Sequence, residues 1–428
     1  MFSSNWFIIQ DGHVVSTKIF NLFKDDFEIG DIGLNEKGYN SKFVGFIIKN
    51  DKLLVSFPKH YFSNEKLQEY QFVDDSTKEK IQDDIKILFR VIQKNLVKKS
   101  MKSIGIRNEI NSGYPFQHFF EVYNYFLKFG LYTDEREIRK LGYSGKIDWK
   151  RTILKSPIVV SNNNLVYMPM VIKKRINEHV FISKCMAYVI DMTANALSIF
   201  MNLKRTNLDI KDINWENEKL IISQLREIKQ RVFKDKQKRL IDSLIRFFEK
   251  QNKGDGTIKI KTRSFDLAWE SIIEFYLKHY FKHIDENGYI NFSESRNMAL
   301  KSFEKKKIYP DRLEKRGRNI QPDYYLVENN LRYIFDAKYF NEVRELNYKQ
   351  ISYYFLLKHF EGIPNENGEI DPLPTNNVLL LPTERNRDDE RNFKKHFDLN
   401  PLFNLDEREF VIREQYLNVK YILKEYVL

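Results

Sequence analysis

The stretch QPDYYLVENNLRYIFDAKYF, residues 321–340, decides the fold of the C-terminal part of the chain. Pro322-Asp323 precedes one extended run, and Asp336-Ala337-Lys338 closes a second run without a turn signal before the charges. Side chains at i and i+2 of a strand lie on one face, so Asp336 and Lys338 point in the same direction. A hairpin that turns at Asn329-Asn330 would bring Asp323 and Asp336 together at one end of a sheet.

This pair of carboxylates has a chemical use. Two carboxylates held close together repel each other unless a divalent cation lies between them. Hard oxygen ligands with open water positions suit Mg²⁺, with Mn²⁺ as the second choice. Lys338 can orient or help to deprotonate a water that attacks a phosphodiester. The stretch therefore predicts phosphodiester hydrolysis, and the alternative is a solvated hairpin with an ion pair, since so short a motif also arises by chance.

Composition limits the remaining classes of protein. The chain has 428 residues, of which 42% are apolar and 30% charged, which predicts a globular protein of two or three domains. Its formal net charge of +12 favours a polyanionic partner such as nucleic acid, although many basic proteins bind none. The single cysteine, Cys185, excludes an internal disulfide framework and lies in an apolar run, which indicates a buried core thiol.

Two absences in the sequence add expectations. The first residues lack the pattern of a signal peptide, and no apolar run reaches the ~20 residues of a membrane span, so we expect a soluble intracellular protein. The chain contains no G-x-x-x-x-G-K-[ST] phosphate loop, so it is not expected to bind a nucleotide.

The periodicity predicts a multidomain α+β chain in three regions. Residues 1–75 are β-rich, with a hairpin over 43–59 that turns at Asn50-Asp51. Residues 76–255 are mixed and mainly helical, and they include extended structure between 145 and 175. The segment KQNKGDG predicts a linker near Gly254, and residues 256–428 follow as a mixed α/β domain.

The segment GKIDWKRTI, residues 145–153, allows two interpretations. Lys146, Lys150 and Arg151 surround an aromatic residue, a combination that can bind a phosphate backbone. Alternatively the segment is a strand in which Ile147, Trp149 and Ile153 alternate into a core, with solvated basic residues opposite. We assign the apolar residues to a core and leave the basic ones open.

The spacing of Pro322-Asp323, twelve residues, and Asp336-Ala337-Lys338 resembles the PD-(D/E)xK (restriction-endonuclease-like) nuclease superfamily. The resemblance implies Asp323 and Asp336 as metal ligands and Lys338 as the residue that positions water. It also implies an acidic residue on the preceding helix, where Glu270 fits as a further catalytic and metal-binding carboxylate. A Q-x-x-x-Y element beside the metal site corresponds to Gln350 and Tyr354. The alternatives are an exposed helix carboxylate and a core tyrosine with a chance glutamine.

Two further blocks, FVGFIIKNDKLLVSFPKHY at 43–61 and GKIDWKRTI, resemble LlaJI-type restriction endonucleases, relatives of the McrC nuclease subunit. The resemblance implies a cytoplasmic prokaryotic protein that cuts double-stranded DNA together with a separate McrB-like AAA+ NTPase. The missing phosphate loop agrees with that division of labour. The N-terminal two-thirds of the chain, residues 1–75 among them, would dock to this partner, with hairpin 43–59 adding surface and the basic helices between 217 and 250 lining a path for DNA. The alternatives are a nuclease of DNA repair or recombination and a non-catalytic DNA-binding subunit with a nuclease-like fold.

Overall fold

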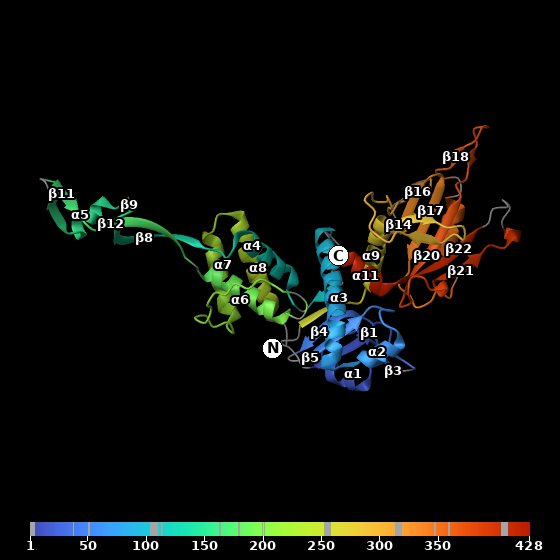
Figure 1. Cartoon of the computed structure of the whole chain (residues 1–428), viewed down its shortest axis with the longest axis horizontal. Coiled ribbons are helices and arrows are strands. Elements are labelled where there is room, and N and C mark those ends of the chain that lie inside the picture. Colours follow the sequence, from blue (N-terminus) through green and yellow to red (C-terminus); the bar gives the residue numbers. More distant parts are fainter. Residues whose placement is uncertain are drawn as a thin grey trace. The chain divides into compact units, whose positions relative to one another are not determined.

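The computed structural model shows two compact units in the chain, each described here by itself (Figure 1). The first unit comprises 1–112 and 256–428, and the second comprises 113–255. The structure describes residues 5–36, 38–49, 52–102, 110–112, 114–161, 164–178, 180–198, 200, 202–251, 258–312, 319–345, 348–357, 360–403 and 410–428. Among the helices in these ranges, none is both long and apolar enough to cross a membrane.

The first unit contains a six-stranded sheet. In spatial order its strands are β6 (Phe72–Val73), β1 (Asn5–Gln10), β5 (Lys52–Phe57), β4 (Val44–Lys49), β13 (Ile258–Thr262) and β7 (Ile110–Ser112). Helix α1 (Thr17–Phe23) buries Ile19 and Phe23 against one face. The short helix α2 (Asn64–Tyr70) begins at the N-cap Ser63, and β2 (Ile32–Asn35) and β3 (Gly38–Ser41) form a separate hairpin.

The predicted hairpin over 43–59 is present as β4 and β5, which pair in antiparallel fashion. Its turn residues, Asn50 and Asp51, lie outside the described residues. Both strands are central, because β5 also pairs with β1 and β4 also pairs with β13. Their backbone hydrogen-bonding edges are therefore already used, and nearly all their side chains are buried. The expectation that this hairpin adds surface to a partner is wrong for that reason.

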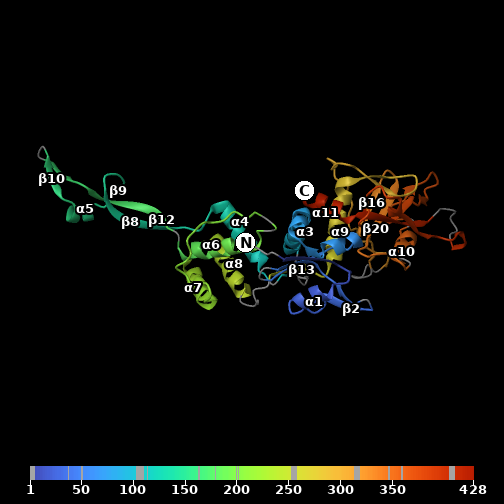
Figure 2. The ribbon, with the colours of Figure 1, turned by 60° about the horizontal axis from the view of Figure 1, so that its bottom comes forward.

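The long helix α3 (Asp75–Lys102) follows this sheet in the chain. Asp74, directly before the first residue of the helix, is its cap: Asp74 Oδ1 accepts a hydrogen bond of 2.8 Å from Thr77 N. The helix packs on β4 and beside α9 and α11 of the same unit (Figure 2). Lys94 Nζ donates to Tyr426 O at 2.5 Å. A residue range that we assigned to the middle region thus contributes to the first unit.

A second, five-stranded sheet carries the quoted stretch. Its spatial order is β16 (Tyr324–Glu328), β17 (Leu331–Ala337), β20 (Thr375–Thr383), β22 (Val411–Asn418) and β21 (Phe393–Asp398). The two outer pairs are antiparallel, whereas β17, β20 and β22 run parallel. The carboxyl ends of these three strands therefore meet at one edge.

Residues at the predicted turn explain the β16–β17 hairpin. Asn329 and Asn330 have φ of +54° and +61°, the left-handed conformations of a tight hairpin turn that asparagine tolerates. Alternate side chains of β17 then face two different layers. Phe335 packs near Phe281, at the end of helix α9 (Phe265–Tyr280). Ile334 packs with Tyr353 of helix α10 (Tyr348–Leu356).

Shorter elements complete this part of the first unit. They are β14 (Phe281–Ile284) and β15 (Ile290–Phe292), β18 (Ile363–Pro364) and β19 (Ile370–Asp371), two short 3₁₀ helices, and the C-terminal helix α11 (Val419–Val427). A mixed sheet with helices on both faces is the mixed α/β arrangement that the sequence predicted.

The second unit consists of helices and a set of short β-structures. The helices are α4 (Phe116–Phe129), α6 (Phe181–Ala196), α7 (Glu218–Arg231) and α8 (Asp235–Gln251). Helix α4 ends at Gly130, which has φ +77°. Cys185 is buried in α6, in agreement with a core thiol.

Strands β8 (Asp134–Gly142) and β12 (Met170–Glu178) of the second unit pair along their whole length. Between them in the chain lie β9 (Lys146–Ile147), α5 (Trp149–Lys155), β10 (Ile158–Ser161) and β11 (Asn164–Tyr167). We call residues 141–168 the arm segment. The strand interpretation of GKIDWKRTI is wrong beyond Ile147, because Asp148 caps α5 by accepting a hydrogen bond from Arg151 N. Trp149 and Ile153 are each 56% exposed and do not enter a core.

The second unit is inserted between two paired strands of the first. Strand β7 ends at Ser112, and β13 begins at Ile258, yet Ser112 pairs with Ile260. The predicted linker falls largely on residues 252–257, which lie outside the described residues. The division into 1–75, 76–255 and 256–428 stays a prediction about domains, and the strand that opens its last region belongs to the six-stranded sheet.

Candidate active site

Asp323 and Asp336 meet at one end of the β16–β17 hairpin. Tyr324 pairs with Phe335 in the register of the two strands, so the next pair outward is Asp323 and Asp336. Asp336 is 1% exposed, and Asp323 is half-buried at the start of β16. The tight turn and the antiparallel register thus bring together two carboxyl groups that are separated by twelve residues in the chain.

The electrostatics of this pair show one proton shared by two acids. Burial raises the pKa of Asp323 to about 8, and the hydrogen bond and the charge of Asp336 raise it in the same direction. Burial also disfavours the ionised form of Asp336, but the hydrogen bond from Asp323 and the charge of Lys338 outweigh it and lower the pKa of Asp336. Near neutral pH the pair therefore holds one proton and one negative charge.

Lys338 supplies the positive charge. Its Nζ forms an ion pair with Asp336 Oδ2, and its side chain is largely shielded from solvent. Its backbone N donates to Leu380 O at 2.9 Å, so the pairing with β20 continues past the end of β17. Asp336 and Lys338 therefore lie on the same face, as the i and i+2 spacing predicted.

Glu270 reaches the site from α9, paired with a lysine. Its Oε2 accepts a hydrogen bond of 2.7 Å from Lys305 Nζ, and its charge contributes to the raised pKa of Asp323. Tyr324 Oη donates to Glu270 O at 2.7 Å and ties the helix to β16. The pKa of Lys305 is raised: burial acts against this, and the hydrogen bond and charge of Glu270, with the charge of Asp323, prevail. The sequence reasoning missed Lys305, which lies in a run of three lysines outside any helix or strand and offers no pattern.

Helix α10 covers the face of β17 on which Asp336 lies. Gln350 is fully buried there. Tyr354 stacks on Phe410 at 4.0 Å between ring centroids, within an apolar cluster. The neighbouring Tyr353 is the tyrosine closer to the acids: burial and then the charges of Asp336 and Asp323 raise its pKa. Its Oη donates to Gln321 O at 3.0 Å. Tyr353 follows Gln350 at i+3, and helical spacing alone could have suggested it.

Lys146, Lys150 and Arg151, the predicted DNA-contacting residues, belong to the second unit. Lys146 lies in β9, and the other two lie in the first turn of α5. All three are exposed, and Arg151 Nε is 4.0 Å from Asp148 Oδ2. Their role in binding DNA stays a prediction.

The carboxylate pair fits a divalent cation by the chemistry of its donors. The two carboxyl groups repel each other when both are ionised, and a bound cation would relieve this repulsion as protonation of Asp323 does. Within the described ranges, no group of three or more His, Cys, Asp or Glu side chains is arranged to hold a metal ion. Glu270 is instead engaged by Lys305. A site of two carboxylates is of the kind that Mg²⁺ occupies with several of its waters retained.

Comparison with known proteins gives the family. A model of the LlaJI restriction endonuclease family matches residues 43–351, well over half of the chain. The chain belongs to the LlaJI restriction endonuclease family. The matched range contains Asp323, Asp336 and Lys338 of this family member, and it ends at Ile351 within α10.

Two similar solved structures are of Thermococcus gammatolerans McrB–McrC complexes. A chain in the refined half-complex from a tetradecameric assembly of Thermococcus gammatolerans McrB AAA+ hexamers with bound McrC is 14% identical, with a TM-score of 0.36. The match covers 99% of this chain and 98% of that one. A chain in the cryo-EM structure of the Thermococcus gammatolerans McrBC complex is 13% identical over 61% of this chain and 84% of that one, with a TM-score of 0.21. No curated protein matches the chain.

Proposed function

We propose that this LlaJI family member is the Mg²⁺-dependent endonuclease subunit of a restriction system and hydrolyses phosphodiester bonds of double-stranded DNA. The observation that carries the proposal is the buried Asp323–Asp336 pair with Lys338 on the same face. Burying two acids and a lysine at the end of a hairpin costs folding free energy, and such groups are found together more often at functional sites than in structural cores.

The residues have distinct roles in this proposal. Asp323 and Asp336 would hold the cation, Mg²⁺ or Mn²⁺, which would polarise the phosphoryl group and lower the pKa of a bound water. Lys338 orients the attacking water or a phosphate oxygen from its position beside Asp336. Glu270 and Lys305 flank Asp323 and support its charge balance. Gln350 and Tyr353 close the α10 side, whereas Tyr354 contributes packing.

A separate AAA+ NTPase is the partner that we propose, because the chain has no phosphate loop and its family resembles the nuclease subunit of McrBC systems. The arm segment offers the surface. Large apolar side chains are exposed along it, which is typical of a protein-binding site. They are Leu141, Tyr143, Trp149, Ile153, Leu154, Ile158, Val159, Val160, Leu165 and Met168. We therefore move the proposed docking surface from residues 1–75 to this segment.

A plasmid-cleavage assay tests the proposal. The purified chain is incubated with supercoiled DNA in Mg²⁺, in Mn²⁺ and in a chelator, with and without a McrB-like AAA+ NTPase and its nucleotide. We expect nicking that needs the metal and a large gain from the partner. Absence of metal-dependent nicking under every condition would contradict the nuclease assignment, and cutting by the chain alone at full rate would contradict the subunit assignment.

A further inference from the structure

Tyr339 directly follows Lys338 and points to the other face of the strand. It is buried, and its ring packs near Phe265 and Trp269 of α9, with ring centroids 5.3 and 6.4 Å away. The side chain thus lies on the α9 face, while Asp336 and Lys338 lie on the α10 face. Tyr339 does not line the acidic site, but its backbone is one peptide bond from Lys338.

Residues that follow strands β1 and β5 of the six-stranded sheet contact the polar atoms of Tyr339. Lys59 N donates to Tyr339 Oη at 2.7 Å, and Lys59 Nζ donates to Tyr339 O at 3.3 Å. Asp11 forms a hydrogen bond with the Tyr339 hydroxyl. Burial raises the pKa of Asp11 to about 6, against the charge of Lys59, so the carboxyl is mainly ionised at neutral pH and accepts this bond. The contacts of Lys59 with Tyr339 join residues 280 positions apart in the chain.

The loop that carries Lys59 is itself held firmly. Phe62 N donates to Gln10 Oε1 at 2.9 Å, and Gln10 Nε2 donates to Phe62 O at 3.3 Å. His60 has φ +58°, a conformation that a non-glycine residue keeps only where its surroundings enforce it. His60 Nδ1 lies 2.8 Å from Glu384 Oε2. Glu384 comes directly after β20, and Asn418 at the end of β22 binds its carbonyl through Nδ2 at 3.2 Å.

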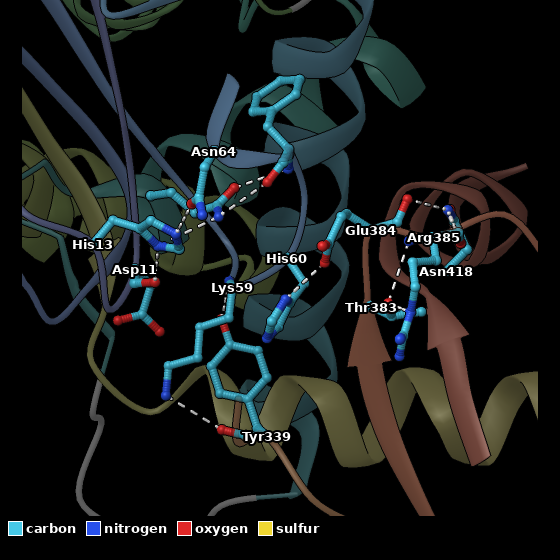
Figure 3. A network of polar contacts seen from close by, with 12 residues as sticks. Asp11, His13, Lys59, His60, Asn64, Tyr339, Thr383, Glu384, Arg385 and Asn418 are labelled. Carbon is cyan, nitrogen blue, oxygen red and sulfur yellow. Dashed lines mark hydrogen bonds and ion pairs between the residues drawn. The ribbon is translucent and has the colours of Figure 1, made fainter. Parts of the chain in front are cut away.

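Residues 58–63 therefore contact the chain just beyond the ends of two neighbouring parallel strands (Figure 3). Lys59 contacts Tyr339, two residues past the end of β17, and His60 contacts Glu384, the residue directly after β20. These are the carboxyl ends that form the edge of the candidate active site. We define Asp11 and residues 58–63 as the N-terminal clamp.

We propose that the N-terminal clamp positions the catalytic end of β17. Tyr339 is the positioning residue: the contacts that hold it also fix the backbone that carries Lys338 and Asp336. The inference rests on the proposed nuclease function and adds a control point outside the nuclease sheet. Hydrolysis of a phosphodiester depends on how well the catalytic side chains are aligned with it, and a misplacement of ~1 Å can cost about 100-fold in rate. Any event that moves the N-terminal clamp away from Tyr339 would then lower the cleavage rate.

The test compares single hydroxyl and carboxyl deletions in the full-length chain. Tyr339→Phe removes only the hydroxyl, and Asp11→Ala removes its partner on the N-terminal sheet. Tyr280→Phe is the matched control, since Tyr280 is also buried and its hydroxyl binds Glu425 and, at 3.2 Å, Arg296 Nε. We expect kcat for plasmid nicking in saturating Mg²⁺ to fall about 10-fold in both clamp variants, with KM for DNA unchanged and no loss in the control.

The double variant Asp11→Ala with Tyr339→Phe separates a shared route from two separate defects. If both residues act through one bond, the double variant is no slower than the slower single variant. Wild-type kcat in both single variants, or a raised KM with unchanged kcat, would overturn the positioning role.

A readout that needs no activity keeps this inference distinct from the nuclease assignment. Amide hydrogen exchange is followed in the peptide that contains Lys338, whose backbone N bonds to Leu380 O. We expect faster exchange there in Asp11→Ala than in Tyr280→Phe. Equal exchange in Asp11→Ala and Tyr280→Phe would overturn the positioning role of the clamp, even if the wild type is an active nuclease. Faster exchange in Asp11→Ala, together with an inactive wild type, would count against the nuclease assignment alone.

Discussion

The β16–β17 hairpin and the arm segment use similar sequence patterns in opposite ways. In the hairpin, most apolar residues of both strands are buried, and Asp336 is buried with them at 1% exposure. In the arm segment, basic residues and large apolar ones both remain exposed, including Trp149 and Val160. Buried charge indicates chemistry, and exposed apolar surface indicates a partner. We therefore propose cleavage for the hairpin region and docking for the arm segment.

The largest expected effect is the loss of cleavage when the buried pair is broken. We predict that Asp336→Asn lowers the rate of metal-dependent nicking by at least about 1000-fold, because a carboxylate ligand is replaced by a neutral amide. The unfolding temperature should stay within a few degrees, since the change also removes the unfavourable interaction with Asp323. Asp371→Asn, an exposed acid on β19, is the control. Full activity of Asp336→Asn would refute the site.

The next effect sharpens the other half of the comparison. Trp149 and Ile153 lie four residues apart on α5 and share a face. We predict that changing both to serine lowers the stimulation by the AAA+ protein by about 30-fold or more, while nicking by the chain alone is unchanged. Lys155→Ser, on the same helix, is the control and should keep the stimulation. Equal stimulation of all three proteins would show that the arm segment is not the docking surface.

Much of the site follows from the sequence because it depends on local rules. Two asparagines specify the turn, the turn specifies the register, and the register brings Asp323 to Asp336. Lys305 and Tyr339 acquire their roles only from residues far away in the chain, and no local period reports such contacts. Residues 149–155 were expected in a strand and form helix α5. The cause is local: Asp148, before Trp149, is the cap of a helix and not a member of an alternating strand.

A moderate effect of pH should separate the buried pair from ordinary surface acids. The pKa of Asp323 is raised to about 8, whereas an unfolded aspartate has a pKa near 3.9. Between these values only the unfolded state ionises, so the metal-free protein loses stability as pH rises toward 8 and loses no more above it. Bound Mg²⁺ must displace that proton. We predict that Mg²⁺ affinity falls by up to about tenfold per pH unit below 8.

Calorimetric titration with Mg²⁺ in buffers of different ionisation enthalpy measures this effect. We expect close to one proton released per ion at pH 6.5 and almost none at pH 9. The variant Asp323→Asn should bind Mg²⁺ more weakly and without the pH dependence. A Mg²⁺ affinity that is flat from pH 6 to 9 in the wild type would show that the two acids do not share a proton.

The smallest expected effect on chemistry comes from the largest deletion. The second unit enters after β7 and returns at β13, and these strands are paired with Ser112 opposite Ile260. Insertions at such adjacent ends leave the host fold intact when they are removed.

We predict that replacing residues 114–256 by a short glycine-serine turn yields a folded nuclease whose basal kcat is within about 3-fold of wild type. A deletion that keeps β7 but starts again at residue 264 serves as the contrast. It removes β13 from its place between β4 and β7, exposes an edge of β4 and should unfold the protein. Both deletion variants are measured by circular dichroism and by the nicking assay, each with and without the AAA+ protein. If excision of the second unit abolishes basal cleavage in a folded protein, the helices or the arm segment contribute to the reaction itself, and the division between a cutting region and a docking region fails.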